Sequence, residues 1–229
     1  MDTVILAGGK NTRLSGVVPA YHKPLLVING ETLVSRLVKQ ALEVVSYEGR
    51  VFVLVSQYNC AAIMDVVLSQ FRMRHNITFI LQQEWMDVAD AFVETLSLTS
   101  APSVMLMCAD NYISSHDWNL FKTTVEEEPS PISVLELTSR LDAKRFARLL
   151  PDNSSMISGP VNDFECTDEP YRCWVGPVVI DAQKTLDKLL LSPDRTVIAD
   201  HLCPYSDDTF HTVNMDVKDI GIPEALPCA

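Results

Sequence analysis

The sequence contains no long hydrophobic run. No stretch approaches the roughly 20 consecutive apolar residues that a membrane-spanning helix needs, so we expect no transmembrane segment. The amino terminus also lacks the basic start, apolar run and small-residue cleavage site of a signal peptide. We therefore predict a cytoplasmic protein without a membrane partner.

Basic residues are scarce as well. The 229 residues include 18 Lys and Arg against 30 Asp and Glu, which gives a formal net charge of -12. A nucleic-acid-binding surface needs clustered Lys and Arg, so this composition argues against a nucleic-acid partner. An anionic ligand would have to be held locally, by a glycine loop, a few positioned cations and a metal ion.

The cysteines form no CxxC pair. In a chain of this length, scattered cysteines indicate buried free thiols in preference to a disulfide framework or a metal site. The six cysteines are Cys60, Cys108, Cys166, Cys173, Cys203 and Cys228.

Apolar runs and helical spacing alternate along the chain, without an internal repeat or a clear linker. Strands are expected at 3–6, 51–56, 77–81, 103–107, 131–137, 146–150 and 174–180. Helices are expected at 32–45, about 59–72, about 88–97, 182–191 and 196–201. This order is typical of an α/β fold, in which helices cover both faces of a mostly parallel sheet. With 47% hydrophobic residues, the chain can bury the core of one domain spanning 1–229.

A glycine pair follows the first expected strand, in the segment LAGGKNTRL. Ligands of open α/β sheets bind beyond the carboxyl ends of the strands. Gly8 and Gly9 would let backbone N–H groups approach a phosphate, and Arg13 could grip two phosphate oxygens. Thr12 could add a hydroxyl and Lys23 a second cation. Neither GxxxxGK[ST] nor GxGxxG is present, and the glycine pair is also compatible with a plain tight turn.

The segments VILAGGKNTRL and HKPLLVINGETLVSRLVKQAL resemble the amino-terminal signature of the sugar-1-phosphate nucleotidylyltransferases, or nucleotide-sugar pyrophosphorylases. The family pattern is LAGGxGTRL, a gap, and then KPLLPVxGKPLI leading into a helix. The ten-position gap from Arg13 to Lys23 fits these enzymes better than the related molybdenum-cofactor guanylyltransferases, although Asn11 replaces a glycine. The resemblance implies a Rossmann-like, glycosyltransferase-A-like fold, with a nucleotide-binding part at about 1–115 and an acceptor-binding part at about 130–215.

The same resemblance implies a set of nucleotide-binding residues. Gln82, in LQQEWMDVADAF, matches the glutamine that reads the base. Asp87 stands where the family has a glycine under the nucleoside, and a carboxylate there could restrict the base or ribose pocket. The choice of nucleotide therefore stays open. The implied nucleotide-binding residues are Leu6, Ala7, Gly8, Gly9, Thr12, Arg13, Gln82 and Asp87.

Two aspartates match the magnesium ligands of the family. Asp110 follows a hydrophobic strand in SVMLMCADNYI, which resembles a GDN-type turn with Ala109 in place of the glycine. Asp219, in NMDVKDIGIPEAL, matches the second metal aspartate, with Asp216 as a near competitor. A carboxylate at the end of a buried strand needs compensation, and Mg²⁺ is a suitable partner. The resemblance thus implies Mg²⁺ as the cofactor.

The chemistry that the resemblance implies is nucleotidyl transfer. An acceptor phosphate attacks the α-phosphorus of a nucleoside triphosphate in line, and pyrophosphate leaves. Arg13 and the glycine loop would hold the leaving phosphates, while Lys23 would bridge the attacking and α-phosphates, so these two cations are the predicted catalytic residues. No covalent step is required, in agreement with the lack of an obvious Ser-His-Asp or Cys-His arrangement.

The acceptor region departs furthest from the family. The segment LDAKRFARLLPDNSSMIS resembles its D-P-x-R-[YF]-G-V-V stretch, but GPVNDFE lacks the lysine of the family's E-K-P. Either Arg145, Arg148 or Arg172 substitutes for that lysine, or the acceptor is unusual. Asp163 and Glu165 could bind sugar hydroxyls or a cationic head group such as choline. The implied acceptor-binding residues are Asp110, Arg145, Asp163, Glu165 and Gly176.

Two classes of function stay open at this point. The first is a magnesium-dependent enzyme that uses a nucleoside triphosphate and a phosphorylated small molecule, most simply a sugar-1-phosphate, with an alcohol phosphate such as phosphocholine as the alternative. The second is a catalytically silent regulatory or scaffold relative, which the residues at Asp87 and Ala109 and the missing lysine favour. We favour the enzyme, because Arg13, Lys23 and both metal aspartates are kept. Homo-oligomerisation stays open.

Overall fold

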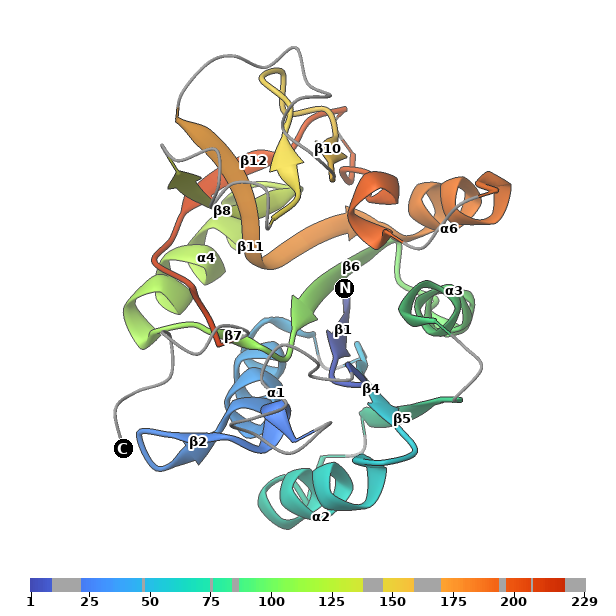
Figure 1. Ribbon diagram of the computed structural model, residues 1–229, viewed down its shortest axis with the longest axis vertical. Helices are drawn as coiled ribbons and strands as arrows, with labels where there is room; N and C mark the ends of the chain where they lie inside the picture. The colour runs from blue at the N-terminus through green and yellow to red at the C-terminus, as the bar shows by residue number, and fades with distance from the viewer. Residues whose placement is uncertain are drawn as a thin grey trace.

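In the computed structural model, nine strands of the described residues form one mixed sheet (Figure 1). The described residues are 1–9, 22–46, 48–74, 76–83, 87–137, 146–158, 170–193, 197–206 and 208–220. The order along the main path is β10-β9-β11-β6-β1-β4-β5. These strands are β1 (Asp2–Leu6), β4 (Val51–Ser56), β5 (Ile77–Gln82), β6 (Ser103–Cys108), β9 (Arg148–Leu149), β10 (Met156–Ile157) and β11 (Tyr171–Asp181).

The first four long strands are parallel, as the alternating sequence pattern predicts. β1 pairs in parallel with both β4 and β6, and β4 pairs in parallel with β5. β11 then runs antiparallel to β6, and it also pairs with β8 (Pro131–Leu137), which is parallel to β12 (His211–Asn214). The predicted α/β fold with a mostly parallel mixed sheet is therefore confirmed. The second half of the chain extends the sheet, as expected.

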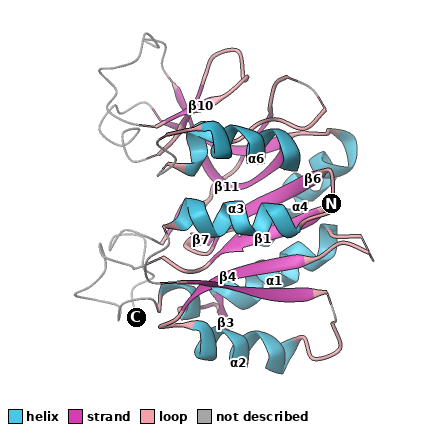
Figure 2. Ribbon diagram, turned by 90° about the vertical axis from the view of Figure 1, so that its right-hand side faces the viewer, coloured by secondary structure: helices cyan, strands magenta, loops and turns pink. Residues whose placement is uncertain are grey.

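Helices cover both faces of the sheet (Figure 2). Figure 2 shows α3 (Val88–Leu98) and α6 (Ala182–Leu191) in front of the sheet, with α1 (Leu33–Val44) and α4 (Ser115–Glu127) behind it. α2 (Cys60–Gln70) shares the core of α1 and α4. Alternate strand residues enter the two cores, because side chains of a strand point to opposite faces. Ile5 thus packs on the α1 side and Val4 on the α3 side.

Several elements differ from the sequence prediction, among them α4, β12 and the last predicted helix. α4 was not predicted, because its sequence is mostly polar and only Trp118 and Phe121 are buried. Its start is fixed by Ser114, whose hydroxyl accepts a hydrogen bond from the Asp117 N–H at 3.1 Å. The short strand β12 was not predicted either. The helix predicted at 196–201 is a single 3-10 turn, η4 (Ile198–His201).

Four described cysteines have free thiols, as predicted: Cys60, Cys108, Cys173 and Cys203. Only Cys173 is fully buried as a residue, and burial raises the pKa of its thiol to about 11. That thiol is therefore neutral at neutral pH. Cys166 and Cys228 lie outside the described residues. Among the helices of the described ranges, none is long and apolar enough to cross a membrane.

Gly176 marks a bulge in β11, where the register with β8 shifts between Trp174 and Val178. Its φ is +75°, a backbone conformation that favours glycine. A Cβ at this position would lie 2.9 Å from the Ser133 Oγ and 3.1 Å from a methyl group of Val217. The position therefore excludes a side chain for two separate reasons.

Gly176→Ala should lower the free energy of unfolding by about 1–3 kcal/mol, because it combines backbone strain with crowding. Gly30→Ala is the matched control, since Gly30 has a φ of +81° and no atom lies within 4 Å of an added Cβ. Urea unfolding of both variants measures how much free energy of unfolding each one loses relative to the wild type. Equal losses would show that crowding at Gly176 contributes nothing.

Candidate active site

The site lies where β1, β5 and β6 end at one edge of the sheet. Leu6 pairs with Cys108 at the ends of β1 and β6, and the Ala109 N–H donates to the Leu6 carbonyl at 3.0 Å. The segments that follow the two strands therefore start side by side. This arrangement brings the glycine pair close to Asp110, although the two are a hundred positions apart in the chain.

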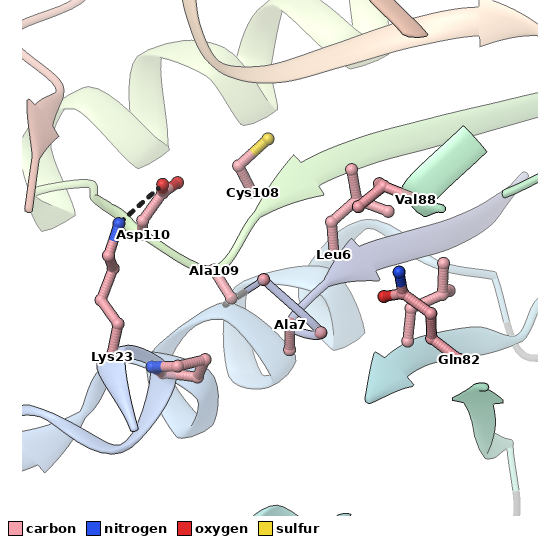
Figure 3. A pocket seen from close by; sticks show the side chains of 12 residues that line it. Leu6, Ala7, Lys23, Gln82, Val88, Cys108, Ala109 and Asp110 are labelled. Carbon is pink, nitrogen blue, oxygen red and sulfur yellow. Dashed lines mark hydrogen bonds and ion pairs between the residues drawn. The ribbon is translucent and has the colours of Figure 1, made fainter. Parts of the chain in front are cut away.

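These strand ends surround a cavity of about 180 Å³, here called the first cavity. Figure 3 shows Lys23 and Asp110 on one side of it, and Gln82 and Val88 on the other. The glycine pair and Cys108 also line it. Seven of the residues that the sequence analysis assigned to catalysis, to nucleotide binding or to metal binding thus lie around one cavity: Leu6, Ala7, Gly8, Gly9, Lys23, Gln82 and Asp110.

Gly8 makes room for the side chain of Gln82. A Cβ on Gly8 would collide with the Gln82 Oε1, and it would lie 3.5 Å from the backbone nitrogen of Ser56. Gly9 differs, because nothing lies within 4 Å of an added Cβ there. The first glycine therefore sets the position of the Gln82 amide in the cavity.

Gly8→Ala should raise the KM for the nucleoside triphosphate that the sequence analysis predicts as substrate about three- to tenfold, because it would displace the amide of Gln82, the predicted base-reading residue, and cost about one hydrogen bond. The fold should be unaffected, since the colliding atom is the end of a flexible side chain. Gly9→Ala is the control and should keep the wild-type KM. Steady-state kinetics at fixed acceptor concentration test this, and equal KM values for the two variants would contradict it.

Lys23 and Asp110, which both line the first cavity, form an ion pair. The Lys23 Nζ lies 3.1 Å from the Asp110 Oδ2, and the side chains are 14% and 38% exposed. Lys23 opens η2 (Lys23–Leu25), a 3-10 turn in which Pro24 is buried. Because the proline restricts the backbone there, the turn holds the base of the lysine side chain in place.

A second carboxylate reaches the same region through a short ladder. β7 (Asn111–Tyr112) pairs with β13 (Lys218–Asp219), so that Asp219 lies opposite Asn111. The Ile220 N–H also donates to the Asp110 carbonyl at 2.8 Å. Asp216 lies elsewhere: it is exposed, and its N–H lies 3.4 Å from a carboxylate oxygen of Asp117. The geometry thus groups Asp219, and not Asp216, with Asp110.

Asp110 and Asp219 both line a further cavity of about 290 Å³, here called the second cavity. Cys108 and Asp110 line both cavities, so the two spaces meet at these residues. Burial raises the pKa of the Cys108 thiol, the carboxylates of Asp110 and Asp219 raise it further, and Lys23 lowers it. Cys108 is therefore a neutral thiol, and no nucleophile, where the two cavities join.

Residues 2–152 match the family model of the nucleotidyl transferases, which covers more than half of the chain. The chain belongs to the nucleotidyl transferase family. A comparison with the sequences of curated proteins finds no match. The two cavities described above are therefore the candidate substrate sites of a nucleotidyl transferase.

Solved structures share the fold at low sequence identity. A protein assigned as a glucose-1-phosphate thymidylyltransferase from Bacillus anthracis is 16% identical, with a TM-score of 0.75, and the match covers 98% of this chain and 92% of the other. HddC from Yersinia pseudotuberculosis is 19% identical, with a TM-score of 0.65 and coverage of 98% and 95%. A UDP-glucose pyrophosphorylase is 13% identical, with a TM-score of 0.68 and coverage of 98% and 94%.

The donor set of the nucleotidyl transferase site fits Mg²⁺. Within the described ranges, no three or more His, Cys, Asp or Glu residues form a ready-made metal cluster. Asp110 and Asp219 nevertheless supply two carboxylates from adjacent segments. Mg²⁺ is commonly bound by one or two carboxylates together with substrate phosphates and water. These two aspartates could therefore hold the ion once phosphates are present.

Several predicted site residues lie outside the described residues: Thr12, Arg13, Arg145, Asp163 and Glu165. Gly176, a predicted acceptor-binding residue, lines the second cavity. Asp87 is not among the described residues that line the first cavity, although its neighbour Val88 is. Its side chain caps α3 by accepting from the Asp90 N–H at 2.8 Å. A helix cap thus gives a structural reason for the aspartate at this position.

Two further positions bear on the departures from the family pattern. Ala109 is buried, and it is not among the described residues with a positive φ, so its methyl group imposes no backbone strain. Arg172 donates to the carbonyls of Leu150 and Pro151 at 3.2 and 3.0 Å, which fixes the turn after β9. Neither Arg172 nor the buried Arg148 lines the second cavity. The described structure therefore gives neither arginine the place of the missing lysine.

The sequence analysis missed several residues that line the two cavities, among them Cys108 and Asn111. Both flank the predicted aspartate in CADNY, and both line the second cavity. Their proximity to Asp110 in the sequence was the available signal. Neither residue type is diagnostic of phosphate chemistry by itself.

Proposed function

We propose that the protein transfers a nucleoside monophosphate from a nucleoside triphosphate to a sugar-1-phosphate, giving a nucleotide sugar and pyrophosphate, with Mg²⁺ as cofactor. One observation carries this proposal: the two cavities meet at Asp110, with Lys23 beside it in the first cavity and Asp219 beside it in the second. Two substrates bound on either side would bring their phosphates together at these charged groups.

The first cavity has the features of a triphosphate site. Gly9 leaves open space beside the backbone after β1, and Lys23 offers a cation at the cavity wall. In the transfer, Lys23 would exchange part of its contact with Asp110 for phosphate oxygens, stabilising the charge that builds up as pyrophosphate leaves. Mg²⁺ held by Asp110 and Asp219 would supply further charge neutralisation at the phosphates.

The second cavity suits a small phosphorylated acceptor. Aromatic and aliphatic side chains line it, including Phe146, Trp174 and Val175, together with a few polar groups such as Ser158. This mixture is usual in small-molecule sites. Two structures that share the fold contain ligands of these classes, which supports the proposal: HddC was solved with GMP-PN, and the UDP-glucose pyrophosphorylase with UDP-glucose.

Pyrophosphate release tests the proposal. Each common nucleoside triphosphate is combined with glucose 1-phosphate, other sugar-1-phosphates and phosphocholine, with Mg²⁺ or with excess EDTA. We expect turnover with one sugar-1-phosphate, and none with EDTA. Turnover with phosphocholine and with no sugar-1-phosphate would show that the acceptor is an alcohol phosphate. Nucleotide binding without turnover in any pairing would identify a silent relative instead.

A further inference from the structure

Tyr112 belongs to a small apolar cluster, here called the hairpin cluster, whose members come from two places in the chain. One is the hairpin of β2 (Val27–Ile28) and β3 (Glu31–Thr32), together with the residues on either side of it. The other is the β7–β13 ladder, together with the residue that follows it. The members are Leu26, Ile28, Leu33, Tyr112 and Ile220. Packing in this cluster therefore attaches the hairpin to the ladder.

The hairpin is a direct continuation of the turn that holds Lys23. The Leu26 N–H donates to the Lys23 carbonyl at 3.1 Å, and the Leu33 N–H donates to the Leu26 carbonyl at 3.0 Å. Backbone hydrogen bonds thus link the lysine turn, the hairpin and the start of α1. A shift of the hairpin would move the backbone of Lys23 with it.

Tyr112 makes two specific contacts to this unit in addition to its packing in the hairpin cluster. Its hydroxyl accepts a hydrogen bond from the Asn29 Nδ2, at the tip of the hairpin, at 2.9 Å. The Arg36 guanidinium, on α1, lies 4.9 Å from the centre of its ring, which is a cation–π distance. Because Tyr112 is two positions after Asp110, it links the segment of that carboxylate to the segment of Lys23.

Both partners of Tyr112 are held by local contacts of their own. Asn29 and Gly30 have φ values of 53° and 81°, and positive φ at both central residues is the mark of a tight two-residue hairpin turn. The Arg36 Nε lies 3.5 Å from a carboxylate oxygen of Glu31, at the other side of the same hairpin. The hairpin and α1 therefore present a preformed site for the tyrosine side chain.

We propose that Tyr112 is a positioning residue, which keeps Lys23 against Asp110 by anchoring the β2–β3 hairpin to β7. Tyr112 is not among the described residues that line either cavity, so it acts through the Lys23–Asp110 ion pair (Figure 3). The inference rests on the proposed function, in which Lys23 acts on the phosphates. An anchor of this kind keeps the cation in place while it exchanges Asp110 for phosphate oxygens, and a misplaced charge would slow the transfer step.

Kinetics separate positioning from a general effect on the fold. Tyr112→Leu removes the hydroxyl and the ring, so it should lower kcat for pyrophosphate release about tenfold and change each KM less than about twofold. Tyr112→Phe keeps the ring beside Arg36 and should retain about half of the wild-type kcat or more. In a Lys23→Met background, Tyr112→Leu should cause no further loss, because the group that it positions is gone.

Phe210→Leu is the matched control, because Phe210 is buried in the core on the α3 side of the sheet. It should keep the wild-type kcat. A Tyr112→Leu loss that multiplies with that of Lys23→Met would overturn the proposal, as would an equal loss in Phe210→Leu. Either result would mean that the tyrosine acts on the fold as a whole.

Hydrogen exchange tests the anchor without any turnover. Exchange of the amides of 23–33 is measured by mass spectrometry in the wild type, Tyr112→Leu and Phe210→Leu. We expect Tyr112→Leu to exchange this segment about tenfold faster or more, with 51–56 in β4 unchanged. Unchanged exchange at 23–33 in Tyr112→Leu, or equally fast exchange in Phe210→Leu, would overturn the anchor. Faster exchange confined to Tyr112→Leu, in a protein without turnover, would overturn the proposed reaction alone.

Discussion

Asp110→Asn should lower kcat for pyrophosphate release by about a thousandfold, the largest effect expected from a single substitution in the described site. The amide has the size of the carboxylate but no charge. It cannot neutralise Lys23, whose Nζ lies 3.1 Å from the carboxylate, and it is a poor ligand for Mg²⁺. Because Asp110 borders both cavities, the loss would affect both substrates.

The stability of this variant should change little. An ion pair with a partner that is 38% exposed contributes about 1 kcal/mol or less, so the unfolding midpoint should stay close to that of the wild type. Asp216→Asn is the matched control, because Asp216 is exposed and lies apart from the cavities. It should keep the wild-type kcat. An Asp110→Asn protein that retains activity, or a control that loses it, would exclude Asp110 as the metal ligand.

Much of the fold follows from the sequence, because its central strands are buried on both faces. All six residues of β4 are buried, which makes VFVLVS a continuous apolar run that predicts a strand. α4 has no such signal, since its contact with the sheet depends mainly on Trp118 and Phe121. A helix with so few buried side chains is specified by its Ser114 cap and by the surface of the sheet against which it packs. That surface is formed by residues far away in the sequence, so the local sequence does not predict the helix.

The candidate site was predictable in its residue types but not in its contacts. Lys23 and Asp110 were both singled out from motifs, yet their ion pair joins positions 87 apart in the chain. The motif favoured Asp219 over Asp216, which is only three positions away, and the β7–β13 ladder shows that Asp219 is the one that lies opposite Asn111, the neighbour of Asp110. The cap that Asp87 makes on α3 also depends on where the helix begins. The local sequence shows which side chains could bind phosphate or metal, and the fold determines which of them lie close together.

Lys23→Met should lower kcat by about a hundredfold, because it removes the described cation nearest to the two cavities while keeping a side chain of similar length. The contact that Lys23 makes with Asp110 holds that cation at the place where the phosphates would meet. Lys39→Met is the control, since Lys39 is exposed on α1, and it should keep the wild-type kcat.

The two largest effects differ in their dependence on Mg²⁺. Asp110→Asn should raise the half-saturating Mg²⁺ concentration about tenfold or more, because it removes one of the two proposed carboxylate ligands. Lys23→Met leaves both carboxylates and removes the cation that competes for Asp110, so its half-saturating Mg²⁺ concentration should stay equal or fall. Titrating pyrophosphate release with Mg²⁺ at saturating substrates measures both values. A higher Mg²⁺ requirement in Lys23→Met would mean that the lysine supports the metal site. This result would contradict the proposal that Lys23 acts on the phosphates.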